Sequence, residues 1–87
     1  MTASGRNATE TAVWEMWTRI LAAGPASVHD DFFDLGGQSL DLVRFLQEVW
    51  QAYQVELDMA ELFAADFTVA TSARAIDDNL ARSEVVA

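Results

Sequence analysis

The chain has no cysteine, so neither disulfides nor a cysteine-ligated metal can stabilise it. It also has only one proline and four glycines, which is too few turn-forming residues for a many-stranded β structure and favours helices. Apolar residues are plentiful, at 52% of the total. That content can build a small core in one domain of 87 residues. We expect one folded unit over about residues 9–82, with loosely ordered ends.

Lysine is absent as well. Five arginines stand against fourteen acidic residues, which gives a formal net charge of −9. An acidic surface repels nucleic acids and anionic membranes and attracts basic patches on other proteins. The sequence shows no charged-then-apolar leader and no apolar run of membrane-spanning length. We therefore expect a cytoplasmic monomer whose partners are proteins, with no nucleic acid and no membrane among them.

The first stretch with helical spacing begins after Asn7, which forms a possible capping box with Glu10, and ends at Gly24-Pro25. Its apolar residues are Val13, Trp14, Trp17, Ile20 and Leu21. Two tryptophans on one helix could form a ligand platform. At positions i and i+3 of an amphipathic helix they more often belong to the core, and we favour the core.

A second helix is expected from about Ser39 to Tyr53, with an inward apolar stripe. That stripe consists of Leu42, Phe45, Leu46, Val49 and Tyr53. Leu40, Val43 and Trp50 make the apolar face wider than one core contact needs, which suggests a recognition surface. We favour recognition for Leu40 and Val43, whereas Trp50 fits a buried central helix equally well.

Residues 25–38, between these helices, show no periodicity, and a connection of this length often has a function or packs locally. Val28, Phe32, Phe33 and Leu35 are expected to hold it against the helices, with at least one of the two phenylalanine rings in the core.

Residues 54–57 read as an extended segment. Asp58 is expected to cap a short helix over residues 59–64, and Thr68 to cap the last helix. The apolar residues of that last helix are Val69, Ala73, Ile76 and Leu80. The predicted fold is all-α: a bundle of three longer helices and one short helix, with a long loop between the first two.

Ser39 is the residue of greatest chemical interest. It is expected to be the N-cap of the second helix, with its hydroxyl exposed. Gly36 and Gly37 before it allow a sharp turn that leaves the hydroxyl unobstructed. A helix N-terminus is also favourable for a phosphate group, because free N–H groups and the helix dipole face it, although Asp41 competes for that field.

Two other readings of this region are weaker. Gly37-Gln38-Ser39-Leu40-Asp41 is half of a nucleophile elbow, but the second glycine is replaced by Asp41 and no strand precedes it. His29, with Asp30 or Asp31, could supply a base for a small serine hydrolase, although a lone loop histidine usually has no such role. Counting a calcium loop from Asp30 fails, since the sixth position, which needs glycine, is Leu35. We expect no metal site.

The stretch from His29 to Leu40 resembles the signature D-x-F-F-x-L-G-G-[H/D]-S-L of peptidyl carrier proteins, the thiolation domains of nonribosomal peptide synthesis within the phosphopantetheine-binding acyl carrier superfamily. Trp14 and Trp17 lie in a helix similar to the first helix of that family. The segments before the short helix and at the start of the last helix also resemble it.

The resemblance implies that Ser39 carries a 4′-phosphopantetheine arm donated by coenzyme A, with Gly36 and Gly37 supporting the turn. The chain would then be a carrier and not an enzyme. Its partners would be a phosphopantetheinyl transferase, an adenylation enzyme, and condensation or tailoring enzymes of natural-product biosynthesis. The positions that match the usual partner-facing residues are Leu40, Val43, Arg44, Met59 and Phe63.

The chain departs from the family pattern in three places. Gln38 stands where histidine or aspartate is usual, Phe67 stands before Thr68 where proline is usual, and Ser72 stands where leucine is common. An acyl carrier protein of polyketide or fatty-acid synthesis remains an alternative, as does a helical interaction module without a prosthetic group. From its first residue and short tail, we expect a freestanding carrier rather than an excised domain.

Overall fold

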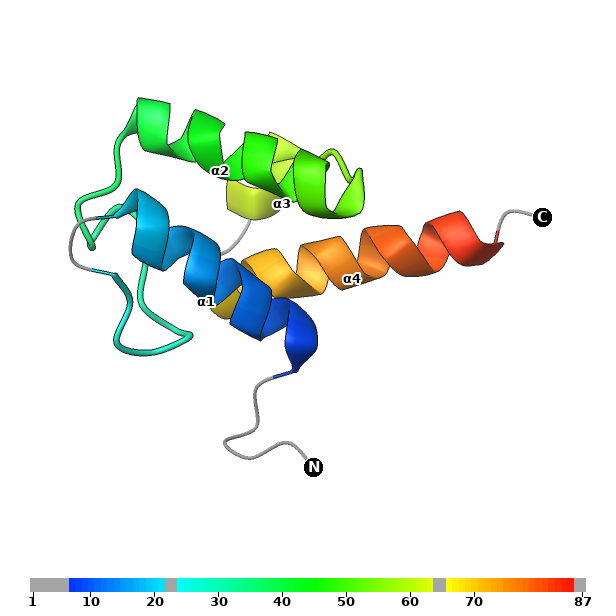
Figure 1. The fold of residues 1–87 in the computed structure, drawn as a ribbon, viewed down its shortest axis with the longest axis horizontal. Helices are drawn as coiled ribbons and strands as arrows, with labels where there is room; N and C mark the ends of the chain where they lie inside the picture. Colours follow the sequence, from blue (N-terminus) through cyan, green and yellow to red (C-terminus); the bar gives the residue numbers. More distant parts are fainter. Residues whose placement is uncertain (1–6, 22–23, 64–65, 86–87) are drawn as a thin grey trace.

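The computed structural model describes residues 7–21, 24–63 and 66–85 of the chain. Four helices make up this part (Figure 1): α1 (Ala8–Ile20), α2 (Ser39–Tyr53), α3 (Met59–Phe63) and α4 (Val69–Val85). In the described residues the only strand-like pairing is one isolated bridge. The expected all-α fold, with three longer helices, one short helix and a long loop between α1 and α2, is confirmed.

Three of the helix starts follow from local capping, as predicted. Asn7 forms a full capping box with Glu10: the Glu10 N–H donates to the Asn7 side chain at 2.7 Å. The Asp58 carboxylate accepts from the Ala60 N–H at 2.9 Å, and the Thr68 hydroxyl accepts from the Thr71 N–H at 3.1 Å. A cap of this kind typically contributes about 1 kcal/mol.

One predicted helix end is wrong, and a second falls outside the described residues. The first helix ends at Ile20, before Gly24-Pro25, with Leu21 already extended and buried. The short helix runs from Met59 to Phe63, and Ala64, where we expected it to end, lies outside the described residues.

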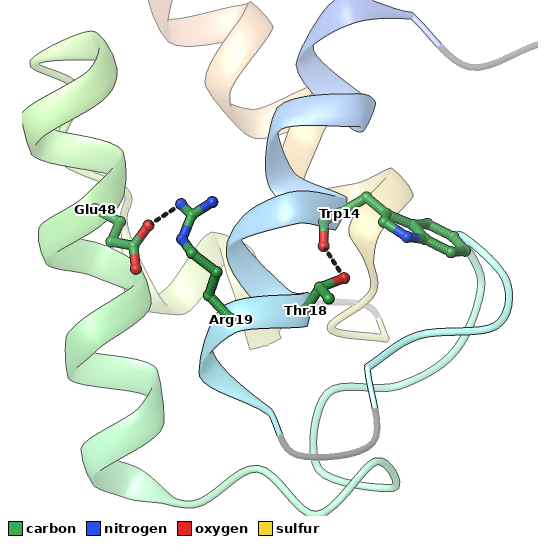
Figure 2. Close-up of polar contacts among 4 residues, drawn as sticks. All are labelled: Trp14, Thr18, Arg19 and Glu48. Atoms are coloured by element: carbon green, nitrogen blue, oxygen red, sulfur yellow. Dashed lines mark hydrogen bonds and ion pairs between the residues drawn. The ribbon is translucent and has the colours of Figure 1, made fainter.

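The core is built around Trp17, whose side chain is fully buried. Its ring lies edge-on to the rings of Phe32, Phe45 and Phe67, with centroids 4.9, 6.0 and 5.4 Å away. Edge-to-face aromatic pairs at these distances contribute about 0.5–1.5 kcal/mol beyond the area they bury. Trp17 is thus a core residue, as predicted. Trp14 is half-buried and packs against the core, with its indole on the side of the α1–α2 loop (Figure 2).

The long loop is held down by the segment before α4. The Phe32 N–H donates to the Phe67 carbonyl at 2.8 Å, and Asp31 forms the isolated bridge with Thr68. The Ala70 N–H donates to the Val28 carbonyl at 3.0 Å. Phe32 is fully buried, which confirms that one ring of the pair fills the core. These contacts fix the position of the loop, and with it the position of the first residues of α2.

Polar contacts tie the helices together at the surface. Arg19 of α1 forms an ion pair with Glu48 of α2 (Figure 2). The Thr9 hydroxyl of α1 donates to the Asp77 carboxylate of α4 at 2.6 Å. Burial, together with the negative charge of Asp77, raises the pKa of the Tyr53 hydroxyl at the end of α2. Asp77 thus lies where three helices meet.

Two buried polar atoms, Trp17 Nε1 and Ser72 Oγ, have no hydrogen-bond partner among the described residues. Ser72 is fully buried on α4. A buried hydroxyl without a partner costs about 1–3 kcal/mol, so we expect Ser72→Ala to raise the free energy of unfolding by about 1 kcal/mol. Urea denaturation of both proteins measures the change.

The neighbouring Thr71 provides the control. Its hydroxyl donates to the Asp66 carbonyl at 2.8 Å and accepts from the Thr68 N–H at 2.9 Å. We expect Thr71→Ala to lower the free energy of unfolding. A loss of stability in Ser72→Ala as large as that in Thr71→Ala would show that the Ser72 hydroxyl has a partner after all.

Candidate functional site

Ser39 is the first residue of α2 and is exposed. The prediction that it is the N-cap is wrong. The N-cap is Gln38, in an extended conformation with φ −125° and ψ 176°. The Asp41 carboxylate reaches back to accept the Gln38 N–H at 3.0 Å, which fixes the cap one residue earlier than the preference of serine suggests.

This shift matters for the chemistry of Ser39. Its hydroxyl forms no hydrogen bond to another residue of the described chain, whereas an N-cap hydroxyl would be engaged with the helix backbone. The Ser39 side chain is therefore exposed at the start of the helix, and its hydroxyl has no hydrogen bond to another described residue that would have to break before it reacts. The N–H groups of Ser39 and Leu40 have no intrahelical acceptor and lie outside the capping box of Gln38 and Asp41, so they can stabilise a phosphate bonded to this oxygen. The residues present fit a phosphate-linked group.

Gly36 and Gly37 are needed for different reasons. Gly36 has φ +94°, a backbone conformation that favours glycine, and its N–H donates to the Phe33 carbonyl at 3.1 Å. A β-carbon at Gly37 would overlap the ring of Phe32 and approach the Phe32 carbonyl oxygen to 2.9 Å. The turn before Ser39 is thus packed directly on the buried Phe32 ring.

Among the residues that the structure describes, none forms a hydrogen bond with the Ser39 hydroxyl that could make it a base for this serine. His29 lies in the loop and lines a surface hollow with four aspartates and Leu35, and Ser39 does not line that hollow. Asp30 accepts backbone N–H groups from Ala26 and Ser27, both at 2.9 Å, so its carboxylate serves the loop turn. This arrangement gives no support to a serine hydrolase.

The aspartates of the loop have a structural task that the sequence did not reveal. Asp31 accepts the N–H groups of Phe33 and Asp34 at 2.9 and 3.1 Å, so its carboxylate holds the loop turn. Within the described residues, no three acidic or histidine side chains are arranged to hold a metal ion.

The predicted partner-facing residues are all on the surface. Leu40 is 72% exposed, Val43 48%, Phe63 48% and Met59 39%, and Arg44 is exposed beside them. Val43 of α2 and Met59 of α3 line one groove, so the structure brings these two together. Large exposed apolar side chains gathered at one surface are typical of protein-binding sites.

Two exposed aromatic residues extend this surface. Phe33 is 43% exposed and its ring lies 6.0 Å from that of Phe63. Trp50 is 54% exposed, which decides between the two readings of this residue in favour of the surface. The sequence could not separate Phe33 from Phe32, since both are apolar loop residues and the difference arises from the turn that Asp31 holds.

The family model for the phosphopantetheine attachment site matches residues 11–76. The chain belongs to this family. Its carrier domains hold 4′-phosphopantetheine as a covalently attached group and have no catalytic activity, so the cofactor of this carrier domain is 4′-phosphopantetheine and the domain itself is not an enzyme.

A solved structure of the phosphopantetheine transferase Sfp in complex with coenzyme A and a peptidyl carrier protein contains a similar chain. The match has a TM-score of 0.76 at 31% identity and covers 88% of this carrier and 99% of that chain. The structure of McyG A-PCP with phenylalanyl-adenylate matches with a TM-score of 0.68 at 33% identity, over 79% of this carrier and 11% of that chain. These likenesses identify the carrier as one of the peptidyl type.

Curated relatives include tyrocidine synthase 3 of Brevibacillus parabrevis, 40% identical over 72 residues. Bacitracin synthase 2 of Bacillus licheniformis is 36% identical over 58 residues. The matched segments are 83% and 67% of this carrier but only 1% and 2% of the two synthases.

No helix in the described parts of the carrier is long and apolar enough to cross a bilayer.

Proposed function

We propose that Ser39 is the attachment residue and that the carrier presents an aminoacyl or peptidyl group to enzymes of nonribosomal peptide assembly. The observation that carries this proposal is the exposed Ser39 hydroxyl at the start of α2, free of the capping role. Ser72 is fully buried, and the Ser27 hydroxyl accepts the His29 N–H at 3.1 Å. Neither of these serines is as available.

In the proposed modification, the Ser39 oxygen bonds to the phosphorus that carries pantetheine in coenzyme A. The bond from that phosphorus to the nucleotide leaving group breaks, and the hydroxyl proton passes to a base. We assign that base to the transferase, since no described residue forms a hydrogen bond with the Ser39 hydroxyl. Gly36 and Gly37 hold the turn, and the first-turn N–H groups of α2 face the phosphate. The arm supplies a thiol for thioester linkage, which this cysteine-free chain lacks.

The partners follow from this chemistry: a phosphopantetheinyl transferase, an adenylation enzyme that loads the arm, and condensation or tailoring enzymes that use the cargo. We further propose that the 87 residues form one domain and act as a freestanding monomer in the cytoplasm, where coenzyme A is available. The single aromatic core and the match to 99% of the similar chain in the Sfp structure support one self-sufficient folding unit.

Incubation with coenzyme A and a broad-specificity transferase separates the candidate functions. A carrier gains one arm, whereas an interaction module without a prosthetic group gains none. Loading by adenylation enzymes with a panel of amino acids supports the peptidyl type, and acceptance of acyl groups alone would instead favour an acyl carrier of polyketide or fatty-acid synthesis.

We expect Val43→Asp to slow loading by about tenfold, because a charge at the centre of an apolar contact costs on the order of 1–3 kcal/mol in the complex. Stability should change little, since Val43 is already 48% exposed. Arg44→Glu should slow loading, or change which adenylation enzyme loads the carrier, if a carboxylate of the partner forms an ion pair with Arg44. Loading rates at two salt concentrations, with melting curves of each variant, measure both effects.

Ala52→Asp is the matched control, because Ala52 is exposed on the same helix and lines neither the groove nor the turn at Ser39. Loading of this variant should equal that of the unmodified sequence. Normal loading of Val43→Asp and Arg44→Glu, together with a sharp fall in their melting temperatures, would show that this face belongs to the core.

A further inference from the structure

An open apolar groove of about 570 Å³ runs along the C-terminal half of α2. We call it the Trp50 groove. Its apolar lining includes Val43, Trp50 and Met59, and its polar lining consists of Gln47, Gln51 and Glu56. The groove is separate from the turn at Ser39, because neither Ser39 nor Leu40 lines it.

The wall of the groove is built by a backbone reversal after α2. Gln54 adopts the left-handed conformation, with φ 56° and ψ 39°, and its N–H donates to the Trp50 carbonyl at 2.7 Å. The chain then runs back beside the helix, and Val55 and Leu57 are buried. With these two residues anchored in the core, the groove is preformed rather than dependent on a partner to open it.

Trp50 is the residue that most needs an explanation. It is 54% exposed, although full burial of a large apolar side chain such as phenylalanine stabilises a fold by about 1.5–3 kcal/mol. Tryptophan and methionine are enriched at protein interfaces, and tryptophan dominates their energetic centres. The two glutamines are exposed and offer amide donors and acceptors at the rim.

Charge favours a basic occupant. Glu56 is exposed and is the one charged residue that lines the Trp50 groove among the described residues. The chain as a whole has a net charge of −9, so a second copy would be repelled, whereas a basic partner would be attracted.

Position also favours a protein partner. Trp50 follows Ser39 by eleven residues, which is about 16 Å along the helix at 1.5 Å per residue. Val43 and Met59 belong both to the Trp50 groove and to the proposed partner face. A protein docked at that face could therefore reach the groove without a break in the contact.

We propose that the Trp50 groove is a second docking site, occupied by a partner-protein segment that inserts one large apolar side chain beside Trp50 and places an arginine or lysine near Glu56. This inference rests on the proposed function only in that the partner also meets the α2–α3 face. We expect such partners to contact both ends of α2. Trp50 and Glu56 would then help determine which partner proteins the carrier binds.

The test uses a synthetic helical peptide with a leucine stripe flanked by lysine and arginine as the probe, titrated into the isotope-labelled carrier and followed by NMR. We expect saturable shifts of Val43, Met59 and the Trp50 indole, with a Kd below about 1 mM. Trp50→Ala should raise that Kd by about tenfold. Glu56→Gln should raise it by a smaller factor and weaken its dependence on salt.

Two controls make the result decisive. A peptide with glutamate in place of its basic residues should not bind, and Ala52→Ser, a change at an exposed residue of α2 outside the groove, should bind the basic peptide as the wild-type carrier does. The proposal is overturned by any of four results: absence of binding up to about 1 mM, equal binding of the acidic peptide, an unchanged Kd in Trp50→Ala, or self-association that protects Trp50.

Modification is measured separately to distinguish this inference from the proposed function. The Trp50→Ala carrier should still gain its arm from coenzyme A and a transferase. Loss of peptide binding with normal arm attachment supports the docking site. The opposite outcome is that the wild-type carrier binds the peptide but neither it nor any variant gains an arm. In that case the proposed attachment at Ser39 fails, while the proposed docking at the Trp50 groove stands.

Discussion

Ser39→Ala is expected to abolish attachment of phosphopantetheine, whereas the wild-type chain gains one phosphopantetheine arm. The reason is that the alanine has no oxygen to bond to phosphorus, while Ser72 is buried and the Ser27 hydroxyl is hydrogen-bonded. Intact-mass measurement after incubation with coenzyme A and a transferase reports the result directly.

The fold of Ser39→Ala should be preserved, which separates lost chemistry from lost structure. A residue that caps a helix costs about 0.5–2 kcal/mol when replaced by alanine. Ser39 is not the cap, since Gln38 and Asp41 form the start of α2, so we expect a change within about 0.5 kcal/mol. Gross unfolding of the variant, or an arm on Ser27, would contradict the assignment.

Gly37→Ala is expected to lower the free energy of unfolding by about 1–3 kcal/mol, the usual cost of overpacking a core. The added methyl group would overlap the Phe32 ring, which is fully buried and surrounded by other aromatic rings. The turn that carries Ser39 must then move away from its support. Urea denaturation measures the loss, and the rate of arm attachment reports the displaced turn.

Gly36→Ala is the matched control. Nothing lies within 4 Å of the position its β-carbon would take, so its cost arises from the positive φ alone, about 1–2 kcal/mol. Adding Phe32→Leu should recover part of the loss in Gly37→Ala and none in Gly36→Ala, because only neighbouring residues show coupling. Additive effects in both pairs would rule out the proposed contact between Gly37 and Phe32.

The sequence predicted the features that depend on a few neighbouring residues. Asn7, Asp58 and Thr68 were recognisable as caps because each side chain bonds to an N–H two or three positions away. The inward stripe of α2 was equally legible, and Leu42 and Phe45 are buried as expected.

Features that depend on distant contacts could not be predicted in the same way. The sequence placed the cap at Ser39, because serine is a common N-cap, whereas the structure uses the reach of Asp41 to Gln38. Phe67 looked like a departure at a place where proline is usual. In the fold it fills the core beside Trp17 and holds the loop through its carbonyl, a contact made across 35 residues of chain to Phe32.

The exposed residues of the candidate site were only partly predictable. Leu40 and Val43 were expected on the surface because they exceed what one buried face can hold, and this expectation is confirmed. The groove beside Trp50 arises from the reversal at Gln54, a non-glycine residue with positive φ that no local pattern announces.

Peptide mapping of the modified carrier tests the central claim most directly. The chain has no lysine, so cleavage after arginine yields a peptide of residues 20–44 that contains both Ser27 and Ser39. After treatment with coenzyme A and a transferase, we predict one arm on this peptide, and fragmentation should place it on Ser39. An arm on Ser27, an arm on the peptide that contains Ser72, or a chain that gains no arm at all would contradict the account.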